Sequence, residues 1–402
     1  MATGMAAPMI RVLVVDDSVV VRKLVTDVLE ADAGITVAGI AANGKIALQK
    51  IEQLNPDIVT LDIEMPEMDG LETIVEIRKR WPTLPVIMFS TLTAQGAAAT
   101  LEALARGATD YVTKPANVGS VLQAQHRVRD DLIPRIHGLC GRRAIPTAAA
   151  RPSGTASTAP GTPVSARPAV VAPKSAFGAP VPVAKAPRTG APLPVELLAI
   201  GSSTGGPNAL VSLIPQLPAD LGVPVVITQH MPPVFTRLLA ERLDGLSGLT
   251  VREATDGAVL APNVVWLAPG DTHMAFAKRG TSVVVALNKD APEHSCRPAV
   301  DVMLRSAHAI FGGRVLTVIL TGMGRDGTLG AEILSRSGGS VFAQDAATSV
   351  VWGMPGFVAG AGLADRILPL GEIADAIVER VDAGRGTRNN SPTRGARGAA
   401  AR

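Results

Sequence analysis

The sequence is poor in cysteine and aromatic residues, and it contains no long apolar run. Its two cysteines, Cys140 and Cys296, cannot build the disulfide framework of a small secreted protein, which favours a reducing compartment. No apolar stretch approaches the roughly 20 residues that cross a bilayer, so we expect no membrane insertion. The first residues lack a basic region followed by a long apolar region. We therefore expect no signal peptide and a cytoplasmic protein.

Acidic residues are missing from two segments that carry much of the positive charge. Residues 139–192 contain seven Lys or Arg and no acid, and residues 385–402 contain five Arg and no acid. Elsewhere 26 basic residues face 35 acidic ones, although the whole chain has a formal net charge of +3. The acidic balance outside these two segments argues against a nucleic-acid partner.

Proline, alanine, serine, threonine and glycine dominate the middle of the chain, without helical or strand periodicity. Such a segment buries too little apolar surface to offset the entropy lost on ordering. We predict a linker over residues 139–192, between one domain at residues 1–138 and another at residues 193–385. The basic end of the chain, residues 386–402, is predicted to be disordered.

Apolar runs alternate with helical patterns on both sides of the predicted linker. Before it, five βα repeats predict a parallel sheet covered by helices on both faces. After it, the same alternation predicts a doubly wound, mostly parallel α/β domain, with a hairpin or antiparallel addition between about residues 250 and 290. The expected strands are 10–15, 35–40, 57–61, 85–89, 109–113, 197–201, 224–228, 264–268, 282–287, 315–320 and 340–344. The expected helices are 18–31, 43–54, 70–80, 94–106, 118–136, 207–215, 234–243, 299–311, 328–337 and 372–383.

Chemically active side chains follow several of the N-terminal strands. Asp16 and Asp17 come after the first strand, Asp62 ends the third, and Ser90 and Lys114 follow the fourth and fifth. The carboxyl ends of parallel strands meet at one edge of a sheet, so these side chains should converge. Three carboxylates together favour Mg²⁺, and one of them could attack phosphorus and carry an acyl phosphate.

Residues 10 to about 130 resemble a two-component receiver domain, which has a flavodoxin-like fold. The resemblance implies that a chemotaxis histidine kinase is the phosphodonor and that Asp62 is phosphorylated. It also implies roles for further residues: Mg²⁺ ligands Asp16, Asp17, Asp62 and the backbone of Glu64; the switch pair Ser90 and Tyr111; and the phosphate-sensing Lys114.

The stretch Leu197–Gly206, LLAIGSSTGG, ends an apolar run in small residues. It lacks the lysine of a P-loop and the spacing of a dinucleotide-binding turn. It does fit G-x-S-x-G, the strand–turn–helix pattern that exposes a nucleophilic serine. That spacing favours Ser203 over Ser202.

A serine nucleophile requires a base and a carboxylate that orients it. His230 and Asp326 each lie past the end of a predicted strand, so position at the sheet edge favours a Ser203, His230 and Asp326 set. His273 and Asp271 remain the main alternatives, because they also follow a strand. The other histidines of this half of the chain are His294, in a predicted loop, and His308, in a predicted helix.

Several stretches resemble the catalytic domain of chemotaxis protein-glutamate methylesterases over about residues 195–383. They are AIGSSTGGPNAL, VVITQHMPPVFTRLLAERL, WLAPGDTHM, CRPAVDVMLRSA and VILTGMGRDGTLGA. The resemblance implies that Ser203 attacks glutamyl methyl esters of methyl-accepting chemotaxis receptors, with His230 as base and Asp326 orienting it. Deamidation of receptor glutamines would use the same acyl chemistry, and neither reaction would need a cofactor. Further implied roles are an oxyanion donor at Met323 and an orienting residue at Thr204.

The two predicted domains suggest a switch. We hypothesise that the unphosphorylated receiver-like domain covers the Ser203 edge, and that phosphorylation of Asp62 uncovers it through Ser90 and Tyr111. Cys296 is expected to be an unreactive small side chain. The competing functions are a DNA-binding response regulator, an esterase for small substrates, and an inactive homologue that only accepts phosphoryl groups.

Overall fold

The computed structural model describes residues 9–114, 121–141 and 193–383. The predicted tail and nearly all of the predicted linker lie outside the described residues, as does the predicted start of the helix at 118. Within the described residues, no helix is both long and apolar enough to cross a membrane.

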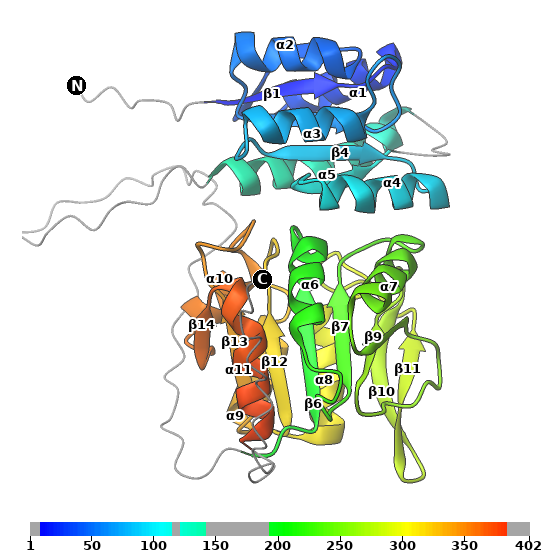
Figure 1. The fold of residues 1–402 in the computed structure, drawn as a ribbon, viewed down its shortest axis with the longest axis vertical. Helices are drawn as coiled ribbons and strands as arrows, with labels where there is room; N and C mark the ends of the chain where they lie inside the picture. The colour runs from blue at the N-terminus through cyan, green and yellow to red at the C-terminus, as the bar shows by residue number, and fades with distance from the viewer. Residues whose placement is uncertain (1–8, 115–120, 142–192, 384–402) are drawn as a thin grey trace, which may run out of the picture.

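The N-terminal domain is a five-stranded parallel sheet in the order β2-β1-β3-β4-β5, with helices on both faces (Figure 1). The predicted (βα)5 architecture is therefore confirmed, and its last helix continues two residues beyond the predicted domain boundary at 138. The strands are β1 Ile10–Val15, β2 Ile35–Ala41, β3 Ile58–Asp62, β4 Val86–Ser90 and β5 Asp110–Thr113. The helices are α1 Val19–Glu30, α2 Gly44–Leu54, α3 Gly70–Arg80, α4 Ala94–Ala105 and α5 Val121–Cys140.

The C-terminal domain contains a seven-stranded parallel sheet in the order β14-β13-β12-β6-β7-β9-β8 and a separate antiparallel hairpin, β10-β11. The sheet strands are β6 Leu197–Ser202, β7 Val225–Gln229, β8 Thr250–Glu253, β9 Val264–Leu267, β12 Val315–Ile319, β13 Ser340–Gln344 and β14 Arg366–Leu368. The hairpin strands are β10 His273–Arg279 and β11 Ser282–Asn288. The helices are α6 Gly206–Leu213, η2 Ile214–Gln216, α7 Phe235–Leu246, α8 Val300–Phe311, α9 Thr328–Arg336, α10 Met354–Gly360 and α11 Leu370–Asp382.

The sequence prediction missed four elements of this domain: β8, β10, β14 and α10. All four have only three to seven residues, and β10 ends in the exposed residues Lys278 and Arg279, so none carries a long apolar signal. The expected hairpin between 250 and 290 is present. It places the predicted strand 282–287 beside β10 rather than in the main sheet.

The helices of the N-terminal domain begin close to the ends of the strands because polar side chains cap them there. Ser18, Asn43 and Thr93 each accept a hydrogen bond from the backbone of the first helical turn. Asp69 forms a capping box with Glu72 at the start of α3. The caps at Ser18 and Asp69 fix the loops after β1 and β3, next to the acidic side chains.

Helices α4 and α5 of the N-terminal domain face the C-terminal domain (Figure 1). Tyr111 of β5 stacks on Phe235 of α7, with ring centroids 4.8 Å apart. Asn208 donates to the Leu104 carbonyl at 3.1 Å, and Arg242 donates to the Leu101 carbonyl at 2.8 Å. Ring stacking and directional hydrogen bonds together define one relative arrangement of the two domains.

Candidate active site and phosphorylation site

Three aspartates meet at the carboxyl edge of the N-terminal sheet. One ligand oxygen of each of Asp16, Asp17 and Asp62 lies within 4.8 Å of the others. Asp16 and Asp62 are 2% exposed, whereas Asp17 is exposed. The structure therefore brings together the three carboxylates that the sequence placed after β1 and β3.

Lys114 is the cation that neutralises this cluster in the structure. Its ammonium lies 2.7 Å from Asp62 Oδ2 and 3.0 Å from Asp16 Oδ2. These two buried oxygens have no well-aligned hydrogen bond, although the ion pairs are short. The pKa of Asp62 is raised to about 6, mainly by burial and in addition by the neighbouring Asp16, while Lys114 and the Ile63 N–H oppose the rise. Under-satisfied carboxylate oxygens of this kind fit Mg²⁺.

Among the described residues, neither expected switch side chain, Ser90 or Tyr111, bonds to the three carboxylates. Ser90 accepts a hydrogen bond from Thr100 at 2.6 Å and donates to the Gly96 carbonyl at 3.0 Å, both on α4. Tyr111 is buried against Phe235, and burial raises the pKa of its hydroxyl. Glu64 is exposed at the loop after β3. Ser90 and Tyr111 therefore connect the acidic edge to α4 and to the C-terminal domain.

Ser203 occupies the turn between β6 and α6. Its N–H donates to the Thr321 carbonyl at 3.1 Å, which ties the turn to the end of β12. Gly205 has φ of 75°, a conformation that favours glycine. A Cβ at Gly322 would lie 2.8 Å from the Cβ of Ser203, so only glycine permits this approach. The glycines on both loops are what allow the two backbones to meet at Ser203.

His230 and Asp326 form a hydrogen-bonded pair beside this turn. His230 Nε2 lies 2.8 Å from Asp326 Oδ2. Asp326 is 1% exposed and also accepts hydrogen bonds from the N–H groups of Val300, Asp301 and Gly327 at 2.6 to 2.8 Å. Although burial opposes ionisation, His230 and the backbone donors outweigh it and hold the pKa of Asp326 below its usual value. Asp326 is thus a pre-organised anion facing an imidazole.

The alternative candidates for the base and the carboxylate are bonded to other partners. His273 is fully buried, with Nδ1 accepting from the Ala299 N–H and Nε2 3.1 Å from the Ala291 carbonyl. Asp271 pairs with Arg297 at 2.6 Å. His308 contacts Ser337 on the surface, and His294 pairs with Asp301 at 2.9 Å. The geometry therefore favours His230 and Asp326 as the partners of Ser203.

Sequence reasoning missed Gln229, which connects the serine turn to the histidine. Its amide nitrogen donates to the carbonyls of Ser203 at 3.0 Å and His230 at 3.2 Å. Its amide oxygen accepts from the buried hydroxyl of Ser202 at 2.7 Å. The side chain is 1% exposed. A buried glutamine at a strand end, directly before the histidine, was the available signal. Ser202 is part of this network.

Met323 and Thr204 lie where the two domains meet. Among the described residues, the Met323 N–H has no hydrogen-bond acceptor. Its side chain packs with apolar residues of α5, and a Cβ on Gly138 would lie 3.3 Å from its sulfur. The Thr204 hydroxyl interacts with Asp110, whose pKa is raised by burial and partly lowered by Arg135 and Thr204. The N-terminal domain thus contacts both Met323 and Thr204, the two residues with implied roles beside Ser203.

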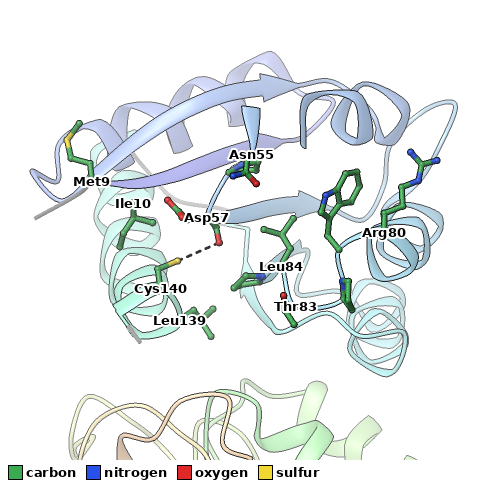
Figure 2. A pocket seen from close by; sticks show the side chains of 13 residues that line it. Met9, Ile10, Asn55, Asp57, Arg80, Thr83, Leu84, Leu139 and Cys140 are labelled. Atoms are coloured by element: carbon green, nitrogen blue, oxygen red, sulfur yellow. Dashed lines mark hydrogen bonds between the residues drawn. The ribbon is translucent and has the colours of Figure 1, made fainter. Parts of the chain in front are cut away.

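A hollow of about 650 Å³ lies at the opposite edge of the N-terminal sheet. Figure 2 shows it between the loop after α3 and the end of α5, lined by Asp57, Arg80, Leu139 and Cys140 among others. The Asp16, Asp17 and Asp62 carboxylates are at the other ends of the strands. We therefore assign no part of the chemistry to this hollow.

Comparison with known proteins agrees with this two-domain arrangement. The family model described as CheB methylesterase matches residues 198–377, and the one described as response regulator receiver domain matches residues 12–126. These matches define the class: a receiver domain joined to a methylesterase domain.

Two curated relatives are similar to nearly the whole chain. A protein-glutamate methylesterase/protein-glutamine glutaminase of Nocardioides sp. is 52% identical over 93% of this chain and 96% of that protein. A protein of the same name from Trichodesmium erythraeum is 46% identical, covering 93% and 99%. The Thermotoga maritima CheB methylesterase catalytic domain, a crystal structure, is 45% identical over 46% of this chain and 99% of that chain, with a TM-score of 0.45. The chain belongs to the protein-glutamate methylesterase/protein-glutamine glutaminase family.

Proposed function

We propose that this chain is a phosphorylation-activated serine esterase that hydrolyses glutamyl methyl esters on methyl-accepting chemotaxis receptors. It also deamidates particular receptor glutamines, because attack by a serine forms the same acyl-enzyme from a glutamyl ester and from a glutamine side chain. The observation that carries the proposal is the His230–Asp326 hydrogen bond beside the glycine turn of Ser203. The protein acts in the cytoplasm, takes its phosphoryl group from a chemotaxis histidine kinase, and contributes to sensory adaptation.

The proposed reaction begins when Ser203 Oγ attacks the γ-carbonyl of the glutamyl ester. His230 Nε2 is engaged with Asp326, so Nδ1 is the nitrogen that receives the serine proton and later delivers it to methanol. Asp326 stabilises the imidazolium formed in between. Water then attacks the acyl-serine, which releases glutamate and restores the serine. With glutamine, the leaving group is ammonia.

The Met323 N–H is the proposed donor to the oxygen that becomes negative during the attack. It has no acceptor among the described residues, and it lies on the loop whose glycine touches Ser203. A backbone donor of this kind stabilises the transition state without reorganisation, and loss of one typically costs about 10²–10³-fold in rate. The Ser203 N–H is not available, because the Thr321 carbonyl already accepts it.

Phosphorylation is proposed to occur at Asp62. Its carboxylate attacks the phosphorus of the kinase's phosphohistidine, and the P–N bond breaks so that the kinase imidazole leaves. The proposed Mg²⁺ ligands are Asp16, Asp17 and Asp62, with the carbonyl of Glu64. Bound Mg²⁺ supplies positive charge for the phosphoryl oxygens. Lys114, which pairs with Asp62 at 2.7 Å, is then free to bind the phosphoryl group.

The proposed switch is a change in the arrangement of the two domains. In the structure, α5 contacts Met323, and Tyr111 stacks on Phe235. A phosphoryl group on Asp62 would attract the Ser90 hydroxyl away from α4 and disturb Tyr111 beside it. The closed arrangement is then populated less, and the Ser203 edge becomes accessible to a large protein substrate.

The test is methanol release from receptor membranes that carry radiolabelled methyl esters. Wild type should release methanol, and a small phosphodonor with Mg²⁺ should increase the rate. Ser203→Ala should abolish release, whereas Ser202→Ala, its neighbour in the same turn, should lose much less. Asp62→Asn should keep the basal rate and lose the stimulation. Release that persists in Ser203→Ala would refute the serine mechanism.

A further inference from the structure

Cys296 contacts the proposed base, His230, at Nδ1, the nitrogen that accepts the serine proton in the proposed reaction. Its Sγ lies 3.5 Å from His230 Nδ1, while Nε2 of the same ring is bound to Asp326. Among the described residues, no hydrogen bond joins Ser203 to His230. The sulfur therefore occupies the position at which the Ser203 hydroxyl must bind for proton transfer.

The turn that carries Cys296 is held firmly in place. Glu293 and Cys296 pair through two backbone hydrogen bonds, and the residues between them, His294 and Ser295, both have positive φ. Two side-chain contacts fix this turn to α8: Arg305 binds Glu293, and His294 binds Asp301 at 2.9 Å. Non-glycine residues in the left-handed region are costly and persist only where their surroundings impose them. The placement of the thiol is thus specified by several contacts.

We propose that Cys296 is a positioning residue that holds Nδ1 of His230 in the resting chain, in competition with the Ser203 hydroxyl. The proposal rests on the assignment of His230 as the base in the proposed function. In the resting arrangement the imidazole is bound on both nitrogens, by Asp326 and by Cys296, and Ser203 is left without its base. Catalysis requires the ring to leave the sulfur.

The charges around the ring make this competition dependent on pH. Burial disfavours the charged imidazolium, but Cys296 and Asp326 outweigh burial and raise the pKa of His230 to about 10. The other titratable groups nearby, His294, Asp301 and Arg305, interact with Asp326 rather than with the ring. A base must be neutral to accept a proton, so a raised pKa confines activity to higher pH.

Two variants separate the charge of the sulfur from its occupation of Nδ1. Cys296→Ala removes both, so the rate should rise at neutral pH and the acid limb of the pH–rate profile should move to lower pH by roughly one unit or more. Cys296→Ser keeps a group that can bind Nδ1 but removes the sulfur, which raises the pKa of His230. It should move the limb in the same direction but leave the plateau rate close to that of wild type. A purely structural cysteine would lower the rate without moving the limb.

The matched control is Cys140→Ala, since Cys140 is the only other cysteine. Figure 2 shows its thiol at the far edge of the N-terminal sheet, 3.9 Å from the carbonyl of Asp57. This variant should keep the wild-type profile.

The decisive measurement is an NMR titration of the full chain with isotope-labelled histidine, in which His230→Gln identifies the signal of His230. The pKa of His230 should fall by roughly one unit or more in both Cys296 variants and stay unchanged in Cys140→Ala. An unchanged pKa in Cys296→Ser and Cys296→Ala would overturn the proposal. This readout requires no turnover. A wild type that releases no methanol would therefore count against the proposed function alone, and the titration would still decide the contact.

Discussion

Asp62, at the end of β3, and Asp326, in the loop after β12, are both buried, but their pKa values are shifted in opposite directions. Asp62 is 2% exposed and its pKa is raised to about 6, whereas Asp326 is 1% exposed and its pKa is lowered. Burial is therefore nearly equal, and the donors make the difference. Asp326 receives three backbone N–H groups and an imidazole, while Asp62 receives one N–H and a lysine beside a second carboxylate.

The difference matches the two proposed tasks. Asp326 must remain an anion throughout the reaction, so its donors are built into the fold. Asp62 must gain a phosphoryl group and a cation, so part of its charge is left under-satisfied until they bind. A carboxylate that is completely satisfied by the protein would have little to gain from Mg²⁺.

The largest effect is expected from Asp326→Asn. The amide keeps the shape but cannot hold the imidazolium, so kcat for ester hydrolysis should fall by about 10⁴-fold. Asp271→Asn is the matched control, because Asp271 pairs with Arg297 rather than with a histidine. It should stay within a few-fold of wild type. A fall of equal size in both variants would contradict the assignment of Asp326.

The next effect concerns the stability of the receiver domain without Mg²⁺. Folded Asp62 keeps its proton up to about pH 6, whereas an unfolded aspartate releases it near 3.8. The folded state then binds more protons between these values, so stability should fall as the pH rises through this window, by about 3 kcal/mol in total. Asp62→Asn should remove this fall.

Hydrogen exchange of the β3 amides, corrected for the intrinsic pH dependence of exchange, measures this change. Asp326→Asn is the control, because a lowered pKa contributes stability that is lost only as the pH falls below the usual aspartate range. In Asp326→Asn, the change of stability with pH between about pH 4.5 and 6.5, roughly the range in which Asp62 titrates, should equal that of wild type. An equal slope in Asp62→Asn as well would show that Asp62 is not the group responsible.

The sequence predicted both carboxylate sites because continuous apolar strands have recognisable ends. Asp62 ends β3, and His230 directly follows β7, so convergence at the sheet edge could be expected. Two donors to Asp326 could not be predicted, since the N–H groups of Val300 and Asp301 approach from the start of α8, 26 and 25 residues away along the chain. The Cys296–His230 contact likewise depends on a turn with two positive φ angles at non-glycine residues.

The domain interface was predictable only in outline. A switch domain attached to an enzyme suggests coverage of the active site, but pairs such as Tyr111 and Phe235 are 124 positions apart and share no local pattern. The predicted linker boundaries, the tail and the roles of the individual site residues stay predictions. Short elements such as β14 were missed because three residues give no periodicity.

A moderate effect is expected from Gln229→Met, which keeps the volume of the side chain and removes its hydrogen bonds. The carbonyls of Ser203 and His230 then lose their common donor, and the two residues are no longer held at a fixed separation. We expect kcat to fall by about 10- to 100-fold while KM changes little. Gln216→Met, which changes an exposed glutamine, should have no effect on kcat. A change confined to KM would show that Gln229 acts on substrate binding instead.

The smallest effect is expected at the domain interface, from Asn208→Ala combined with Arg242→Ala. These changes remove the hydrogen bonds to the Leu104 and Leu101 carbonyls without altering either apolar core. Each bond contributes at least about 0.5 kcal/mol, so loss of both should raise basal methanol release by about fivefold or more. The fully phosphorylated enzymes should have equal rates, because in the proposed switch phosphorylation already opens the interface. Equal basal rates would mean that the receiver does not restrict access to Ser203. A higher rate in the phosphorylated variant as well would place the effect in the esterase itself.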